Sequence, residues 1–191
     1  WHKIIFLDGF GKLISEISFG IDDPTPIKFD SFNSPCFLNL ISTTGQEIVL
    51  VRYDLASSKS EKVFTGNTVN DSWQTSPRLS FDGVWITYVI WSGERYYQGA
   101  ELQDIAVIHL PDGITKQVTQ FHGASVYGGI WSPVEEKLAY SDFDESHFQQ
   151  LFLYDSKMDV RELISNFSDQ DARITPLSWS PGGNRLVFLK E

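Results

Sequence analysis

The sequence predicts an all-β protein built from repeated four-stranded antiparallel sheets. One phrase, in which two apolar runs flank a tight turn, occurs at 75–91, 127–143 and 175–191, with a fainter copy at 27–41. Aligning Ser80, Ser132 and Ser180 gives spacings of 52 and 48 residues. Self-similarity at such a period is typical of a repeat architecture.

A second phrase, strand–turn–strand, lies between the copies of the first. It occurs at 4–17, 48–64, 104–119 and 151–164. Aligning Asp8, Asp54, Leu110 and Asp155 gives spacings of 46, 56 and 45 residues. Two interleaved hairpins with one shared period make a four-stranded unit, whose strands we call A, B, C and D.

Composition agrees with an all-β chain. Aromatic residues make up 14% of the 191 residues. β-branched and aromatic residues fill the apolar runs, whereas Gly, Pro, Asp, Asn and Ser fill the gaps between them. We find no helical periodicity sustained over three turns and therefore predict no substantial helix. The lone Cys36 excludes an internal disulfide and fits a buried strand thiol.

Charge and hydropathy exclude two classes of partner. The net charge of −10 argues against nucleic acid, because phosphate binding needs a clustered basic face. The apolar stretches are far shorter than the roughly twenty residues that span a bilayer, so we expect no membrane span. The sequence does not distinguish a periplasmic or secreted protein from a cytoplasmic one.

Repeated four-stranded antiparallel sheets that stack face to face are the blades of a β-propeller. A single blade cannot bury both of its faces, so its neighbours must cover them. Aromatic residues recur near the A–B turn and are expected in the core between blades: Phe81, Trp85, Trp131, Tyr140 and Trp179. A β-sandwich is the alternative, but a sandwich does not predict a shared period of about 50 residues.

The strands divide into about four blades' worth of one propeller domain, or fragment, over 1–191. We expect a half-blade at 1–19, full blades at 27–65, 75–119 and 127–164, and a half-blade at 175–190. Three arrangements would complete the ring. The chain is part of a larger propeller, which we favour; its two half-blades close a four-bladed ring; or a second copy supplies the missing strands as a homodimer.

Three phrases carry a resemblance: SFDGVWITYV at 80–89, DIAVIHLPDG at 104–113 and WSPGGNRLVF at 179–188. They resemble the repeat of TolB-like propellers, which also occurs in the propeller domains of prolyl oligopeptidases and dipeptidyl peptidases. The resemblance covers 27–191 and the half-unit at 4–17, and implies a ring of about six to eight blades. Glu135-Glu136 departs from the usual Asp-Gly turn, and the turn at 31–35 is degenerate. The WD-repeat family is less similar, because its Gly-His and Trp-Asp dipeptides are missing.

Catalytic patterns are absent from the sequence. There is no Gly-x-Ser-x-Gly elbow, and the four histidines lack zinc spacing. Asp142 and Asp144 resemble the start of a calcium loop, but the Gly and distant Glu of that motif are missing. We therefore expect no catalytic residue, no cofactor and no metal. Asp142 and Asp144 are weak metal candidates, and we interpret their segment as a solvated acidic loop.

Function is therefore expected on the face that carries the long D–A and B–C loops, because loops on a rigid scaffold commonly bind partners. Tyr, Trp and Arg are enriched at binding hot spots. The candidate binding residues on this face are Trp73, Arg95, Tyr96, Tyr97, His122, Tyr127, Phe143, His147 and Arg173. Tyr96 and Tyr97 could equally pack their own loop onto its blade.

We expect a non-catalytic propeller that binds a protein or peptide partner or acts as a scaffold. The main alternative is the gating propeller of a serine hydrolase of the prolyl oligopeptidase or dipeptidyl peptidase kind, with its catalytic domain absent here. A third reading is a propeller lyase or glycosidase, in which Asp142 or Asp144 works with His122 or His147 as an acid–base pair.

Overall fold

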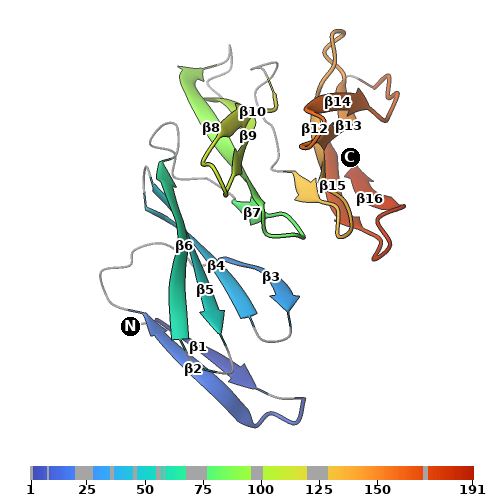
Figure 1. Ribbon diagram of the computed structural model, residues 1–191. Helices are drawn as coiled ribbons and strands as arrows, with labels where there is room; N and C mark the ends of the chain where they lie inside the picture. Colours follow the sequence, from blue (N-terminus) through green and yellow to red (C-terminus); the bar gives the residue numbers. More distant parts are fainter. Residues whose placement is uncertain are drawn as a thin grey trace. The chain divides into compact units, whose positions relative to one another are not determined.

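The computed structural model describes residues 2–7, 9–19, 28–34, 37–44, 47–54, 57, 59–67, 77–95, 101–119, 129–169 and 172–191. These residues form strands and turns without a helix, so the all-β prediction is confirmed (Figure 1). The described part of the chain accordingly offers no helix that could cross a membrane. The chain divides into two compact units, Trp1–Asn67 and Thr68–Glu191, which are described separately.

The first unit contains two antiparallel sheets. β1 (His2–Leu7) pairs with β2 (Leu13–Phe19) in a two-stranded sheet. The second sheet has the order β3-β4-β5-β6. Its strands are β3 (Lys28–Ser34), β4 (Phe37–Thr44), β5 (Glu47–Asp54) and β6 (Lys59–Asn67). Every strand pairs with its sequence neighbour, as the meander of a propeller blade requires.

The second unit contains two complete four-stranded sheets and one half-sheet. The 78–117 blade comprises β7 (Arg78–Leu79), β8 (Trp85–Arg95), β9 (Glu101–His109) and β10 (Thr115–Gln117). The 130–163 blade comprises β11 (Ile130–Trp131), β12 (Lys137–Phe143), β13 (Gln149–Asp155) and β14 (Val160–Leu163). The half-blade pairs β15 (Ile174–Trp179) with β16 (Leu186–Lys190).

Strand register corrects one alignment made from the sequence. Trp85 and Lys137 each lie five residues after the serine of their A–B turn. Their partners across the sheet are His109 and Asp155. His109, and not Leu110, is therefore the equivalent of Asp155. Leu110 already belongs to the C–D turn, so aligning apolar residues shifted the comparison by one position.

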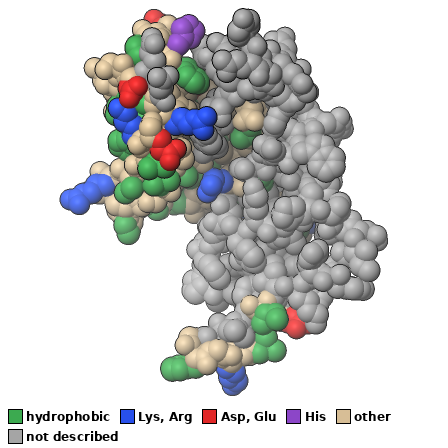
Figure 2. All heavy atoms as spheres, turned by 180° about the vertical axis from the view of Figure 1, so that it is seen from behind, with side chains coloured by type: hydrophobic (Ala, Val, Ile, Leu, Met, Phe, Trp, Pro, Cys, Tyr) green, Lys and Arg blue, Asp and Glu red, His purple; other side chains and the backbone are tan. Residues whose placement is uncertain are grey.

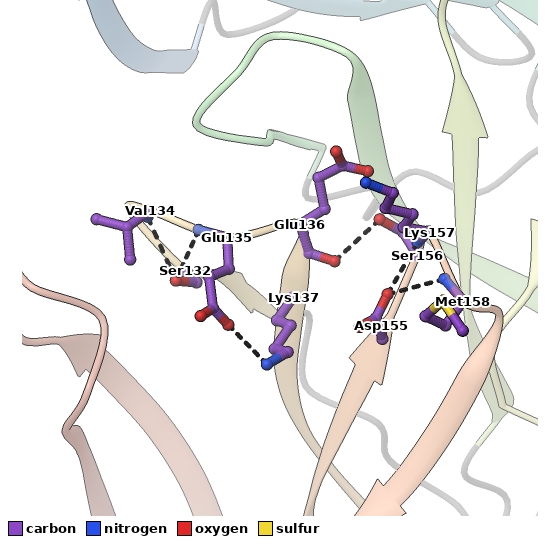
Figure 3. Close-up of polar contacts among 9 residues, drawn as sticks. All are labelled: Ser132, Val134, Glu135, Glu136, Lys137, Asp155, Ser156, Lys157 and Met158. Atoms are coloured by element: carbon purple, nitrogen blue, oxygen red, sulfur yellow. Dashed lines mark hydrogen bonds and ion pairs between the residues drawn. The ribbon is translucent and has the colours of Figure 1, made fainter.

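The serine that defines the repeat closes the A–B turn with the same backbone bond each time, because its N–H donates to the carbonyl oxygen of the residue five positions on, at 2.8 Å in all three turns. The bonds that its hydroxyl accepts differ. The Ser80 hydroxyl accepts hydrogen bonds from the backbone N–H groups of Val84 (3.2 Å) and Trp85 (2.9 Å), and the Ser180 hydroxyl accepts one from Arg185 (3.1 Å). Ser132 accepts from Val134 and Glu135 (Figure 3). A short polar side chain at this position therefore satisfies donors that the tight turn leaves unpaired.

The A–B and C–D turns of the 130–163 blade are bonded to each other. Ser156 donates to the Glu136 carbonyl oxygen from its hydroxyl (3.0 Å) and from its backbone N–H (3.0 Å). Asp155 caps the C–D turn by accepting from the N–H groups of Lys157 (3.1 Å) and Met158 (2.8 Å) (Figure 3). These bonds hold the turn end of the blade rigid even though Glu135-Glu136 replaces the usual Asp-Gly.

Two tryptophans join consecutive blades by equivalent hydrogen bonds. The Trp131 indole N–H donates to the Arg78 carbonyl oxygen, and the Trp179 indole N–H donates to the Ile130 carbonyl oxygen, each at 3.1 Å. In both cases the donor lies one residue before the repeat serine, and the acceptor lies two residues before the serine of the preceding blade. The A strands β7, β11 and β15 are thus linked in series, as they are around a propeller axis.

The cores lie between sheets, as face-to-face stacking predicts. One cluster joins Trp85, Ile105, Val107 and Val118 of the 78–117 blade to side chains of the 130–163 blade, Leu138, Tyr140, Phe152 and Tyr154. A second cluster, of Leu151, Ala172 and Ile174, fills the space between the 130–163 blade and the half-blade. Because both faces of the 130–163 blade are covered, β12 is buried at successive residues and does not alternate. Phe81 was expected in such a core, but it lies on the exposed A–B turn.

Candidate functional site

The predicted loop face is only partly within the described residues. Trp73, Tyr96, Tyr97, His122 and Tyr127 lie outside them, so their candidacy stays a prediction. Arg95 ends β8, where its backbone pairs with Glu101. The structure does not describe its side chain, so its candidacy also stays a prediction. The remaining candidates, Phe143, His147 and Arg173, are described.

Arg173 is exposed and precedes β15 directly. Its backbone exchanges two hydrogen bonds with Glu191, each of 3.0 Å, which extend the β15–β16 ladder by one pair. The strand ladder therefore fixes the backbone of Arg173, while its side chain points into solvent.

Phe143 ends β12, where it pairs with Gln149, and His147 lies in the tight B–C turn that follows. The His147 N–H donates to the Asp144 carbonyl oxygen (3.0 Å), and the Asp144 N–H donates to the Phe148 carbonyl oxygen (2.9 Å). His147 adopts a positive φ of 62°, a conformation that few residues other than glycine take. His147 is exposed at the tip of this turn.

Asp144 holds the turn in shape with its carboxylate. One oxygen accepts from the N–H groups of Ser146 (2.9 Å) and Phe148 (3.0 Å), and the other accepts from the Gln150 amide (2.9 Å). Desolvation opposes ionisation of Asp144, but the hydrogen bonds from Phe148, Gln150 and Ser146 outweigh it and lower its pKa. Asp144 is therefore ionised at neutral pH.

Gln150 connects this turn to the following D–A loop. Its amide nitrogen also donates to the Phe167 carbonyl oxygen (2.7 Å), and its amide oxygen accepts from the Phe167 N–H (2.9 Å) and the Ser165 hydroxyl (2.8 Å). The side chain is fully buried. Sequence reasoning missed this residue, although a Gln-Gln pair at the start of an apolar strand was the available signal.

Asp142 is not the solvated loop carboxylate that its sequence context predicts. Its side chain is 0% exposed and lies 3.1 Å from the Arg161 guanidinium. Its other oxygen accepts from the Phe143 N–H (2.8 Å). The Arg161 guanidinium carbon also lies 3.7 Å from the centroid of the Phe152 ring. The expectation is wrong for Asp142 because the ring-stacked Arg161, on another strand, supplies the opposite charge that permits burial.

A polar chain joins the two full blades of the second unit near this ion pair. Lys116 on β10 lies 3.2 Å from one Asp159 oxygen, and the Tyr154 hydroxyl donates to the other (2.6 Å). The hydrogen bond from Tyr154 and the contact with Lys116 lower the pKa of Asp159. Burial raises the pKa of Tyr154, and its bond to Asp159 raises it further.

A groove of about 700 Å³ opens between these two blades. Its floor is one face of β13 and β14, formed by Phe152, Tyr154, Arg161 and Leu163. Gln117 of β10 and Val118, which follows it, form the facing wall. Phe143 at the end of β12 closes one end together with Asp144, Glu145 and Ser146 of the B–C turn, and Asp159 also lines the groove. Of the predicted binding residues that the structure describes, it is Phe143 that lines this groove.

The groove follows from the radial arrangement of blades. Neighbouring blades diverge with distance from their innermost strands, so large outer side chains must fill the widening space. Here β10 has only 3 residues and β14 only 4. These short outer strands leave the space open. Acidic, basic and hydrophobic side chains lie next to one another on the face of the described chain that Figure 2 shows.

Comparison with known proteins supports the fold. No protein-family model matches the chain, and no curated protein matches it. Among solved structures, an oligogalacturonate lyase in complex with manganese has a TM-score of 0.66 and 17% identity, over 97% of this chain and 51% of its own. The tricorn protease has a TM-score of 0.57 and 16% identity, over 88% of this chain and 16% of its own.

TolB from Acinetobacter baumannii has a TM-score of 0.52 and 15% identity, over 96% of this chain and 44% of its own. This chain therefore spans about half, or less, of each of these three structures. At such identities the likeness establishes the fold alone. The chain has the fold of the TolB-like β-propellers, as its repeat phrases indicate.

Proposed function

We propose that this chain is a section of a TolB-like β-propeller that binds a protein or peptide partner and performs no catalysis of its own. The observation that carries the proposal is the groove between the two full blades of the second unit. Its volume of about 700 Å³ lies within the range of ligand sites, and its lining combines aromatic, apolar and charged side chains.

The rigidity of the groove supports a binding role. Asp144 and Gln150 fix the B–C turn at one end, and the Tyr154–Asp159–Lys116 chain joins the two blades beside it. A preformed surface loses little conformational entropy when a partner binds, so a larger share of the contact energy appears as affinity.

The engagement of the carboxylates favours binding over acid–base chemistry in this region. Asp142 is committed to Arg161, and Asp144 is committed to two N–H donors of its own loop and to the Gln150 amide on β13. A general acid or base must exchange its proton with a substrate during the reaction. The lyase or glycosidase reading would require these bonds to break.

The second candidate function is the propeller domain of a serine hydrolase. Its support is the repeat phrase that resembles oligopeptidase propellers, together with the fold shared with the tricorn protease. The complete reading frame separates the two. An α/β-hydrolase segment in the same frame, labelled by a fluorophosphonate probe at its serine, would replace the non-catalytic proposal.

Selection of phage-displayed random peptides on the purified chain tests the proposal. Phe143→Ala and Leu163→Ser each remove an apolar contact in the groove, and we expect either to weaken retention of the selected peptides by about fivefold or more. Val160→Ser is the matched control, because Val160 lies on β14 but outside the groove lining. Equal losses in all three variants, or no selected peptide, would contradict the proposal.

A further inference from the structure

We infer that the groove recognises an extended peptide segment in which a lysine or arginine side chain lies next to an apolar one. The inference rests on the proposed function and specifies the chemistry of the partner. It follows from the charges at the loop end of the groove and from the apolar surface of its floor.

The negative charge of Asp144, at the loop end of the groove, is not neutralised by its hydrogen-bond donors. All three donors to Asp144 are neutral amides, from Ser146, Phe148 and Gln150, so they orient the carboxylate without neutralising it. Glu145 follows it directly, is exposed and also lines the groove. Two carboxylates side by side attract a cationic side chain.

The positive charge in the groove is already paired. Arg161 lies against the buried Asp142 carboxylate and stacks on the Phe152 ring. Lys116, on the neighbouring blade, is bound to Asp159. Neither cation therefore compensates the Asp144–Glu145 end, and the electrostatic preference of the groove is for a positively charged partner.

The floor favours a long aliphatic stem over a compact cation. Leu163 is 49% exposed and provides apolar surface beside the acidic end, and the half-buried Phe143 adds to it, whereas Phe152 is buried beneath Arg161 and Val118 is buried in the core. Lysine and arginine bury their methylene stems along apolar surface while the charged head stays at a polar edge. The volume of about 700 Å³ exceeds one side chain, so a neighbouring apolar residue of the peptide fits against Leu163.

A peptide array tests this chemistry. The purified chain is applied to nonapeptides with Lys or Arg, Glu or Asp, or Ala at the central position and randomised flanks. We expect retention of the basic set with apolar residues beside the centre. Raising the salt from about 0.1 M to about 1 M, which shortens the Debye length from about 10 Å to about 3 Å, should weaken it.

Paired variants locate the interaction. The double variant Asp144→Asn/Glu145→Gln removes both charges, and the Asn oxygen still accepts from the N–H groups of Ser146 and Phe148, although the bond from the Gln150 amide is lost. We expect about a fivefold loss of affinity for the basic peptides, the sum of the charge contacts of the half-buried Asp144 and the exposed Glu145. Glu162→Gln is the control. Glu162 lies on β14 between Arg161 and Leu163, so its side chain points to the opposite face of the blade.

The outcomes separate the inference from the proposed function. Basic peptides that lose affinity only in the double variant support the inference. Peptides that bind without enrichment of lysine or arginine, or that respond equally to Glu162→Gln, overturn the inference and leave the peptide-binding proposal standing. Retention of no peptide of any class overturns both.

Discussion

At the scale of single residues, buried polar side chains in this protein are held by partners far away in the sequence. Asp142 meets Arg161, Gln150 meets Phe167, and the Ser165 hydroxyl binds Gln150 and accepts from the Leu151 N–H. Each partner is 14 to 19 residues away in the sequence. Arg161 lies two strands from Asp142 in the same sheet, and Ser165 and Phe167 lie in the loop after β14. Burial of these groups is tolerated because both polar atoms of the Gln150 amide are hydrogen-bonded and the Asp142 charge lies against that of Arg161.

The Asp142–Arg161 pair gives the first prediction. Asp142→Ala leaves the partly buried guanidinium without its counterion, and we expect a loss of about 3 kcal/mol in the free energy of unfolding. The double variant Asp142→Ala/Arg161→Met removes both charges and should recover part of that loss. Urea denaturation of the wild type, both single variants and the double variant measures the coupling. Strict additivity would show that the two side chains do not interact.

Asp159 gives the second prediction, a pH dependence. Its pKa lies below its ordinary value of about 3.9, chiefly through the hydrogen bond from Tyr154 and then through Lys116. A lowered pKa in the folded state contributes stability above the unfolded-state pKa, and this contribution is lost as the pH falls through the folded-state value. The stability advantage of the wild type over Asp159→Asn should therefore be full at pH 5 and above, and shrink below about pH 4.

Thermal melting between about pH 3 and pH 6 measures this difference for the wild type and Asp159→Asn. Lys116→Met is the companion variant, because it removes the cation and should reduce the same difference. A gap between wild type and Asp159→Asn that stays constant over this range would refute the assignment of the lowered pKa to this contact.

At the scale of elements, the A–B turn is the unit that repeats most closely. The backbone N–H groups of Ser80, Ser132 and Ser180 each donate to the carbonyl oxygen five residues on, and the indoles of Trp131 and Trp179 link each A strand to the preceding one. The turns also pack against one another. A Cβ added to Gly183 would lie 2.3 Å from a methyl carbon of Val134, in the A–B turn of the preceding blade.

Gly183 gives the third prediction. Gly183→Ala adds a methyl group that collides with Val134 at a position whose φ is +69°, so we expect a loss of about 2 kcal/mol or more in stability. Gly182→Ala is the matched control, because its φ is not positive and its nearest neighbour is Asn184, 3.9 Å away. That change should be neutral or slightly stabilising. Chemical denaturation gives both values, and similar losses in the two variants would contradict the role of the turn contact.

At the scale of the whole molecule, the half-blade β15–β16 differs from the complete blades in what covers it. Ala139, Tyr140 and Ser141 of β12 are fully buried. Val187, Phe188 and Leu189, at the equivalent positions of β16, are exposed. The three arrangements that would complete the ring stay predictions: the two half-blades join each other, a second copy supplies the missing strands, or the strands of a larger propeller do. An apolar strand exposed along its length is an edge that tends to pair with another chain.

Val187 gives the fourth prediction. We expect the isolated chain to self-associate at micromolar concentration, and Val187→Lys to shift it toward monomer by placing a charge on the exposed strand. Val160→Lys is the matched control, because Val160 is 53% exposed and Val187 is 54% exposed. Sedimentation velocity measures the distribution. A wild-type chain that stays monomeric, or a control variant that dissociates it equally, would show that β16 is not the associating edge.

The sequence by itself determined the fold class, the four-stranded repeat, and the residue types that form the A–B and C–D turns. These features depend on local patterns: Ser-Phe-Asp-Gly at 80–83, Asp112-Gly113, and apolar runs spaced by one period. The turn residues act within about five positions, as the bonds of Ser80 and Asp155 illustrate. Short-range chemistry of this kind can be read from residue order alone.

Only the tertiary structure decided the candidate site. The groove needs β10 of one blade and β13 and β14 of the next, and its charge balance depends on pairing Asp142 with Arg161 and Lys116 with Asp159. Asp142 was expected in solvent, and Gln150 and Arg161 were not singled out, because residues near them in sequence do not reveal their partners. Which carboxylate is neutralised and which remains charged depends on residues 19 or more positions away, brought together when strands and blades pack.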